Sequence, residues 1–234
     1  MRALVAVLAL ALLVINCAAP SPTGIYFVKG EEAVTPDGLR QILWEPFRTS
    51  FVRPGARLHA YDKIIIDPLV IEYEKKPSPA RIAYNSIEPN YKLSDGGKES
   101  IRKIYRTSME YQLLEKGSFA VAQSQGPGVL RIRGWILDLA ITAPAMKDQP
   151  PDSTTVVTST GHMTLALDVV DASTGVALIR VADRKQIQDD RDYFVSEGVS
   201  QSGALREIFS KWARNLRREI EQLSALPEIP SPGG

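Results

Sequence analysis

The sequence predicts an α+β protein with two layers, in which a mostly antiparallel sheet carries helices on one face. Two alternating segments joined by a glycine-containing turn predict antiparallel strands, and an amphipathic segment near the C-terminus predicts a long helix. Strand and helix signals do not alternate repeatedly along the chain, which argues against a doubly wound parallel sheet. The expected order is strand, helix, further strands and helix.

The first strand is expected over residues 61–73. An isoleucine run at residues 64–66 is typical of a strand that is buried on both faces. Pro68 interrupts this strand, because proline cannot donate a hydrogen bond to a sheet. The preceding residues 39–57 are expected to be irregular, with aromatic side chains that pack against the domain.

Two helices are expected. Asp95 can cap the first, in which apolar or partly apolar positions recur at steps of three and four from Ile101 to Leu114. Gly117 stands where a glycine commonly ends a helix. The second helix precedes Pro227 and is predicted by a continuous apolar stripe: Leu205, Ile208, Phe209, Trp212, Leu216, Ile220 and Leu223.

Alternation of apolar and polar side chains predicts the remaining strands. Over residues 129–140, apolar side chains alternate with Arg131 and Arg133. The next strand has an apolar face formed by Met163, Leu165, Leu167 and Val169. A hairpin turn at residues 171–175 then leads into a returning strand over residues 176–187.

The N-terminus has the pattern of a secretory signal peptide. A basic start precedes a run without charged or polar side chains from Ala3 to Ile15, which is too short to span a bilayer. The sequence therefore divides into four segments: a signal peptide over 1–16, a lipid-anchored flexible tether over 17–37, a single α+β domain over 38–225 and a disordered tail over 226–234.

Cys17 is the expected anchor. Residues 14–17 resemble a bacterial lipobox, which implies cleavage before Cys17 and attachment of fatty acyl chains such as palmitate. Cys17 is the only cysteine in the chain, and a thioether-linked lipid would leave no free thiol. Ala18 does not match an inner-membrane retention signal, so the outer membrane is expected. The alternative is cleavage after Ala19, which would give a secreted or soluble periplasmic protein.

The charge balance argues against nucleic acid as a partner. The chain has 28 basic and 27 acidic residues, and loss of Arg2 with the signal would leave 27 of each. Nucleic-acid binding needs a strong basic footprint, which this composition lacks.

We find no catalytic or metal-binding motif in the sequence, and no cofactor is implied. His59 and His162 are the only histidines, and neither belongs to a ligand-spaced motif. Ser202 lacks the glycine pattern of a hydrolase elbow and is interpreted as a helix N-cap. Residues 189–192 lack the spacing of a calcium loop and are interpreted as a solvated turn.

Four arginines fall on the expected strands at spacings of two or four: Arg131, Arg133, Arg180 and Arg184. If the face of the sheet away from the helices is open, they could bind an anionic envelope component such as a lipid headgroup, a glycan or a partner protein. The alternative is the ordinary outward placement of polar side chains on a half-buried sheet.

Five segments resemble a family of bacterial lipoproteins, the domain of unknown function 3313: residues 52–56, 61–68, 126–133, 171–175 and 212–213. The resemblance implies a cell-envelope lipoprotein without an assigned activity. We therefore expect a non-catalytic accessory or partner-binding module. The alternative is a periplasmic small-ligand-binding or hydrolase-like lipoprotein, in which residues 142–154 form a lid over a pocket.

Overall fold

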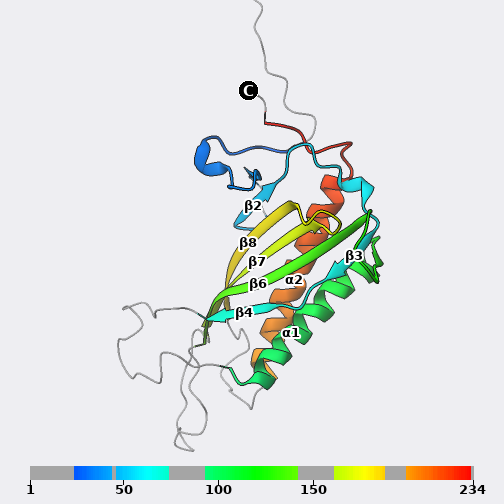
Figure 1. Ribbon diagram of the computed structural model, residues 1–234. Helices are drawn as coiled ribbons and strands as arrows, with labels where there is room; N and C mark the ends of the chain where they lie inside the picture. Colours follow the sequence, from blue (N-terminus) through cyan, green and yellow to red (C-terminus); the bar gives the residue numbers. More distant parts are fainter. Residues whose placement is uncertain (1–23, 44–45, 74–92, 142–160, 188–198, 233–234) are drawn as a thin grey trace, which may run out of the picture.

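An eight-stranded sheet carries the fold, and two helices pack against one of its faces (Figure 1). The computed structural model describes residues 24–43, 46–73, 93–141, 161–187 and 199–232. The strands are β1 (Arg40–Ile42), β2 (Thr49–Val52), β3 (Lys63–Ile66), β4 (Val70–Tyr73), β5 (Ala120–Val121), β6 (Val129–Ile141), β7 (Gly161–Asp171) and β8 (Ala177–Ile187). The helices are α1 (Asp95–Glu110), which continues into a π-helical turn (Tyr111–Glu115), and α2 (Val199–Ser224).

The sheet is mixed, so the expectation of a mostly antiparallel sheet was wrong. The strand order is β1-β2-β8-β7-β6-β3-β5, and β4 pairs with β6 beyond the end of β3. β1, β2, β8, β7 and β6 pair antiparallel, whereas β3 and β4 run parallel to β6, and β5 runs parallel to β3. The parallel pairs arise because α1 lies between β4 and β6 and returns the chain across the sheet. Four strands precede α1, where the sequence predicted one strand region.

The core lies between the helices and the sheet. The predicted apolar face of β7 is confirmed, since Met163, Leu165, Leu167 and Val169 are all buried. On α2, the rings of Phe209 and Trp212 pack edge to face with centroids 5.6 Å apart, and Trp212 Nε1 donates to Asp183 Oδ2 at 2.8 Å. Burial of these large side chains supplies most of the force that holds the layers together.

The helix starts differ from the expectations. Ser94 caps α1 instead of Asp95, because its hydroxyl accepts a hydrogen bond from the Gly97 amide at 3.1 Å. α2 begins at Val199, which places Ser202 inside the helix and not at its cap. In the part of the chain that the structure describes, no helix is both long enough and apolar enough to cross a membrane.

Both ends of the domain are more ordered than the sequence predicted. The tether was expected over 17–37, but the N-terminal arm, residues 24–39, packs against β1, with Ile25 and Ala33 buried. Residues 39–57, expected to be irregular, contain β1 and β2. The tail was expected to be disordered from residue 226, but Ile229 is buried and exchanges hydrogen bonds of 2.8 Å with Gly55 and Ala56. A few apolar side chains in these segments are buried against the domain, which their overall composition does not indicate.

Candidate functional site

The predicted arginines lie on the face of the sheet opposite the helices, which we call the open face. Side chains alternate along a strand, so Arg131 and Arg133 beside the buried Ile132, and Arg180 beside the buried Ile179, point away from the helices. The register places Asp168 of β7 directly between Arg133 of β6 and Arg180 of β8. The open face thus carries opposite charges side by side across three strands.

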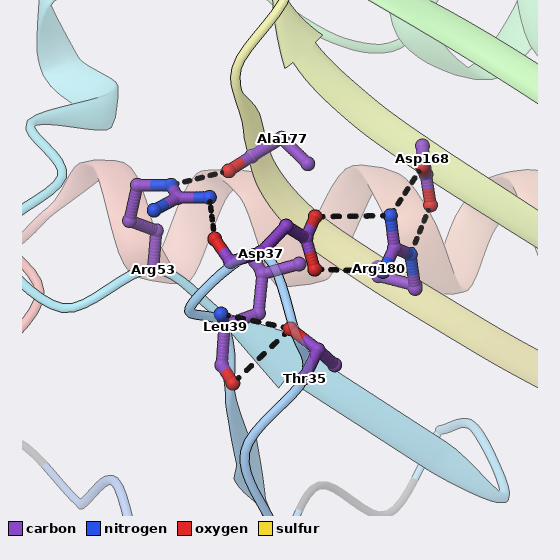
Figure 2. A network of polar contacts seen from close by, with 7 residues as sticks. All are labelled: Thr35, Asp37, Leu39, Arg53, Asp168, Ala177 and Arg180. Carbon is purple, nitrogen blue, oxygen red and sulfur yellow. Dashed lines mark hydrogen bonds and ion pairs between the residues drawn. The ribbon is translucent and has the colours of Figure 1, made fainter.

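Arg180 is the centre of a polar network (Figure 2). Its guanidinium contacts both carboxylate oxygens of Asp168, with Nε–Oδ1 and Nη2–Oδ2 distances of 2.8 and 2.9 Å. It also contacts both oxygens of Asp37 at 3.2 and 3.3 Å. Because Asp37 belongs to the N-terminal arm, these bidentate pairs fasten the arm to β8.

The Arg53 side chain donates hydrogen bonds to backbone carbonyls in and beside the same turn of the arm. Arg53 Nη2 donates to the Asp37 carbonyl at 2.8 Å, and Nε donates to the Ala177 carbonyl at 2.6 Å. The turn closes through hydrogen bonds between Thr35 and Leu39 (Figure 2). Gly38 within it adopts a φ of +85°, which favours glycine. The position of the Asp37 carboxylate is therefore set by a rigid turn.

The charges of the network stabilise one another. Hydrogen bonds to Asp168 raise the pKa of Arg180, and the nearby Asp37 raises it further. The pKa of Asp37 is lowered, first by a hydrogen bond from Thr35 and then by the charge of Arg180. Arg180 and Asp37 are thus both ionised at neutral pH.

Two of the other arginines also have carboxylate partners. Arg131 Nε donates to both oxygens of Asp67 at 2.8 Å, and Arg184 Nη1 lies 3.1 Å from Asp138 Oδ2. Arg133 has no ion pair among the residues that the structure describes. The four arginines therefore do not form a uniformly basic stripe, because three of them are paired with aspartates. The partner carboxylates were not predicted, although the alternation of residues 161–171 places Asp168 on the polar side of its strand.

A carboxyl group of α2 is buried between the helix and the rest of the domain. Glu219 is fully buried, and within the described structure neither carboxylate oxygen has a hydrogen-bond partner. Burial raises the pKa of Glu219 to about 8, so the group is mostly protonated at neutral pH. Its helical spacing from Trp212, Leu216 and Leu223 (seven, three and four residues) already places Glu219 on the apolar stripe of α2, whereas the exposed Glu207 and Glu221 lie off it.

The turn between β7 and β8 is locked by a second carboxylate. Asp171 Oδ1 accepts from the Ser173 amide and hydroxyl and from the Thr174 amide at 2.6–2.8 Å, and Oδ2 accepts from the Tyr61 hydroxyl at 2.7 Å. Partial burial raises the pKa of Asp171, but these hydrogen bonds outweigh it and bring the pKa to about 2. The glycine of the predicted turn, Gly175, has a φ of +73°. This site is structural, since every oxygen is used within the domain.

The two histidines considered in the sequence, His59 and His162, have different surroundings in the described structure. His59 lies beside the Leu226 carbonyl, and the buried His162 lies 3.8 Å from Asp138. Among the described residues, no three histidine, cysteine, aspartate or glutamate side chains are placed to hold a metal ion. Cys17 and the segments 142–154 and 189–192 lie outside the described residues.

The fold and the open face define the chain as an α+β domain with one helix-covered sheet face and one face of paired charges. A family model for a protein of unknown function, DUF3313, matches residues 45–216. The chain therefore belongs to the DUF3313 family, as its sequence segments predicted. No curated protein sequence matches the chain.

Three solved structures are similar to the chain at low TM-score and low sequence identity. PelC from Paraburkholderia phytofirmans, a dodecamer, is 11% identical, with a TM-score of 0.36 over 76% of this chain and 98% of that chain. Protein XCC0632 from Xanthomonas campestris is 8% identical, with a TM-score of 0.40 over 73% and 92% of the two chains. A Caulobacter crescentus protein described as a lipoprotein is 10% identical, with a TM-score of 0.31 over 68% and 90%.

Proposed function

We propose that this protein is a bacterial lipoprotein, held at the outer membrane by acyl chains on Cys17, that binds another envelope protein and catalyses no reaction of its own. The open face supports the binding role. It combines four arginines with aspartates in fixed positions, and the helices pack on the opposite face. We infer that the partner binds there.

The charge pattern favours a protein partner over an anionic glycan or lipid headgroup. Arg131, Arg180 and Arg184 each lie within 3.2 Å of a carboxylate oxygen. A uniformly anionic ligand would meet these carboxylates as well as the arginines, and like charges in contact are costly. A protein surface can offer both signs in register, which gives specificity.

Trp135 provides a large apolar side chain among the charged residues of the open face. It lies on the open face of β6, two residues after Arg133. Its register neighbours are Val70 of β4 on one side and the small Ala166 of β7 on the other, beyond which lies Ala182 of β8. Trp135 is partly exposed. Tryptophan and arginine are enriched among residues that dominate binding energy at protein interfaces. We therefore place the centre of the interface at Arg133 and Trp135.

Site-specific crosslinking in cells tests the partner-binding role. A photoreactive amino acid at position 135 should give a discrete crosslinked product with an envelope protein. The matched control is position 107, an exposed threonine on α1 in the helical layer. Identical products at both positions, or a lipid or glycan adduct at 135 alone, would contradict a protein partner on the open face.

Acyl labelling tests the anchor separately. Cells given labelled palmitate should incorporate it into the wild-type protein, and the substitution Cys17→Ser should abolish incorporation and release the protein from membranes. Two or more acyl chains are needed for stable anchoring, so mass spectrometry of the N-terminal peptide should find at least a diacylated cysteine. A Cys17→Ser chain that matures normally and stays membrane-bound would refute the anchor.

A further inference from the structure

Two large apolar side chains are exposed next to each other at the edge of the sheet formed by the N-terminal arm. Tyr26 is 63% exposed and Leu43 is 66% exposed. The Leu43 amide donates to the Tyr26 carbonyl at 2.8 Å, and the adjacent residues Phe27 and Ile42 form an antiparallel bridge. Tyr26 and Leu43 are therefore opposite each other on neighbouring strand segments and project from the same side.

This apolar pair lies close to the expected anchor along the chain. Ile25 is buried, so the arm is fixed to the domain from this residue onward. Gly24 follows Cys17 by seven residue steps, and a fully extended chain of that length reaches at most about 25 Å. A bilayer that holds acyl chains on Cys17 is consequently within reach of Tyr26 and Leu43.

We propose that Tyr26 and Leu43 insert into the interface of the membrane that holds the Cys17 anchor, so that the β1 edge of the sheet rests on the bilayer. The proposal rests on the acylation of Cys17 proposed above. Tyrosine is suited to this position, because its ring enters the apolar region while its hydroxyl stays among the headgroups. The insertion would bury both side chains about 5–10 Å deep, as for other interfacial segments.

The contact is apolar and not electrostatic. From residue 24 to residue 43 the chain has two basic side chains, Lys29 and Arg40, and three acidic ones, Glu31, Glu32 and Asp37. This balance of two positive against three negative charges offers no net attraction to anionic lipids. Binding should therefore be similar on neutral and anionic vesicles and depend little on salt.

This orientation predicts which parts of the domain face away from the membrane. β1 and β5 are at opposite ends of the strand order, six spacings apart, or about 29 Å at roughly 4.8 Å per spacing. Val121 on β5 is 58% exposed, nearly as much as Leu43. It is a matched apolar position that should remain in water.

The test uses the mature protein acylated at Cys17, reconstituted into phosphatidylcholine vesicles. When Cys17 is acylated, Leu43→Cys introduces the one free thiol, which can carry an environment-sensitive dye. We expect a blue-shifted emission that lipid-borne spin labels quench several-fold more strongly than the same dye at Val121→Cys. Tyr26→Cys provides a second reporter on the same patch if Leu43→Cys folds poorly.

The outcomes distinguish this inference from the proposed function. Acylated Cys17 with equal quenching at positions 43 and 121 would overturn the membrane contact and leave the anchor intact. Absence of acylation, seen by mass spectrometry, would overturn both. A blue shift that disappears when vesicles are diluted to one protein each would indicate a second copy at this edge, and would also overturn the membrane contact.

Discussion

The buried carboxyl group of Glu219 makes a specific prediction about the dependence of stability on pH. Its pKa is about 8 in the folded chain and 4.5 when unperturbed. Below pH 4.5 both the folded and the unfolded states hold the proton, and the stability associated with this group is fully present. As the pH rises, the unfolded state releases the proton first, so the free energy of unfolding falls until the folded state also ionises near pH 8.

The magnitude follows from the two pKa values. Each pKa unit corresponds to about 1.4 kcal/mol. Between pH 5 and pH 8, Glu219 should therefore lower the free energy of unfolding by about 3.5 kcal/mol. Glu219→Gln has nearly the same shape and cannot ionise. Its stability relative to the wild type should rise by that amount over this range. The variant Glu219→Met should show the same trend without leaving a buried amide.

Urea unfolding measured at several pH values from 5 to 8 tests this prediction, with tryptophan fluorescence as the signal. Trp212 is buried on the same helix and reports directly on its packing. The control is Glu221→Gln, which removes a partly exposed carboxylate that pairs with Arg217 at 2.8 Å. Parallel pH profiles for the wild type and Glu219→Gln would refute the assignment of a buried, protonated carboxyl group.

Four further substitutions test packing and the arm. Arg180→Ala should release the N-terminal arm and speed hydrogen exchange of its amides, while unchanged protection would contradict the clamping role of this side chain. Tyr61→Phe should lower the free energy of unfolding by about 1 kcal/mol by removing the hydrogen bond to Asp171, as urea unfolding would show. Gly134→Ala places a methyl group 2.7 Å from the Tyr105 hydroxyl and should cost about 1–3 kcal/mol. Adding Tyr105→Phe should recover part of that loss, because this buried hydroxyl has no hydrogen-bond partner in the described structure.

The periodic parts of the fold could be predicted from the sequence. In a half-buried strand, an alternation of apolar and polar residues determines which side chains are buried. Leu167 therefore faces the helices and Arg180 faces away. The stripe around Phe209 and Trp212 likewise predicted the buried side of α2. These features follow from local geometry and need no knowledge of which strands are neighbours.

Features that depend on distant neighbours could not be predicted. The parallel pairing of β3 with β6 depends on the path of the chain through α1, which no local pattern reports. The arginines were placed on the correct strands, but Asp37 and Asp67 reach them from distant parts of the chain. The arm and tail were misjudged because their few apolar residues, such as Ile25 and Ile229, become buried only against the finished sheet.

The mixed sheet has a consequence for the order in which the domain assembles. β6, β7 and β8 are antiparallel neighbours in sequence order, whereas Lys63 of β3 must find Val129 of β6 across the whole of α1. Closing that longer loop costs more chain entropy and slows pairing. We expect the amides of β7 to become protected from hydrogen exchange early in refolding, before those of β3. A folding chain would then complete the antiparallel β6–β8 pairs first and close its parallel edge last.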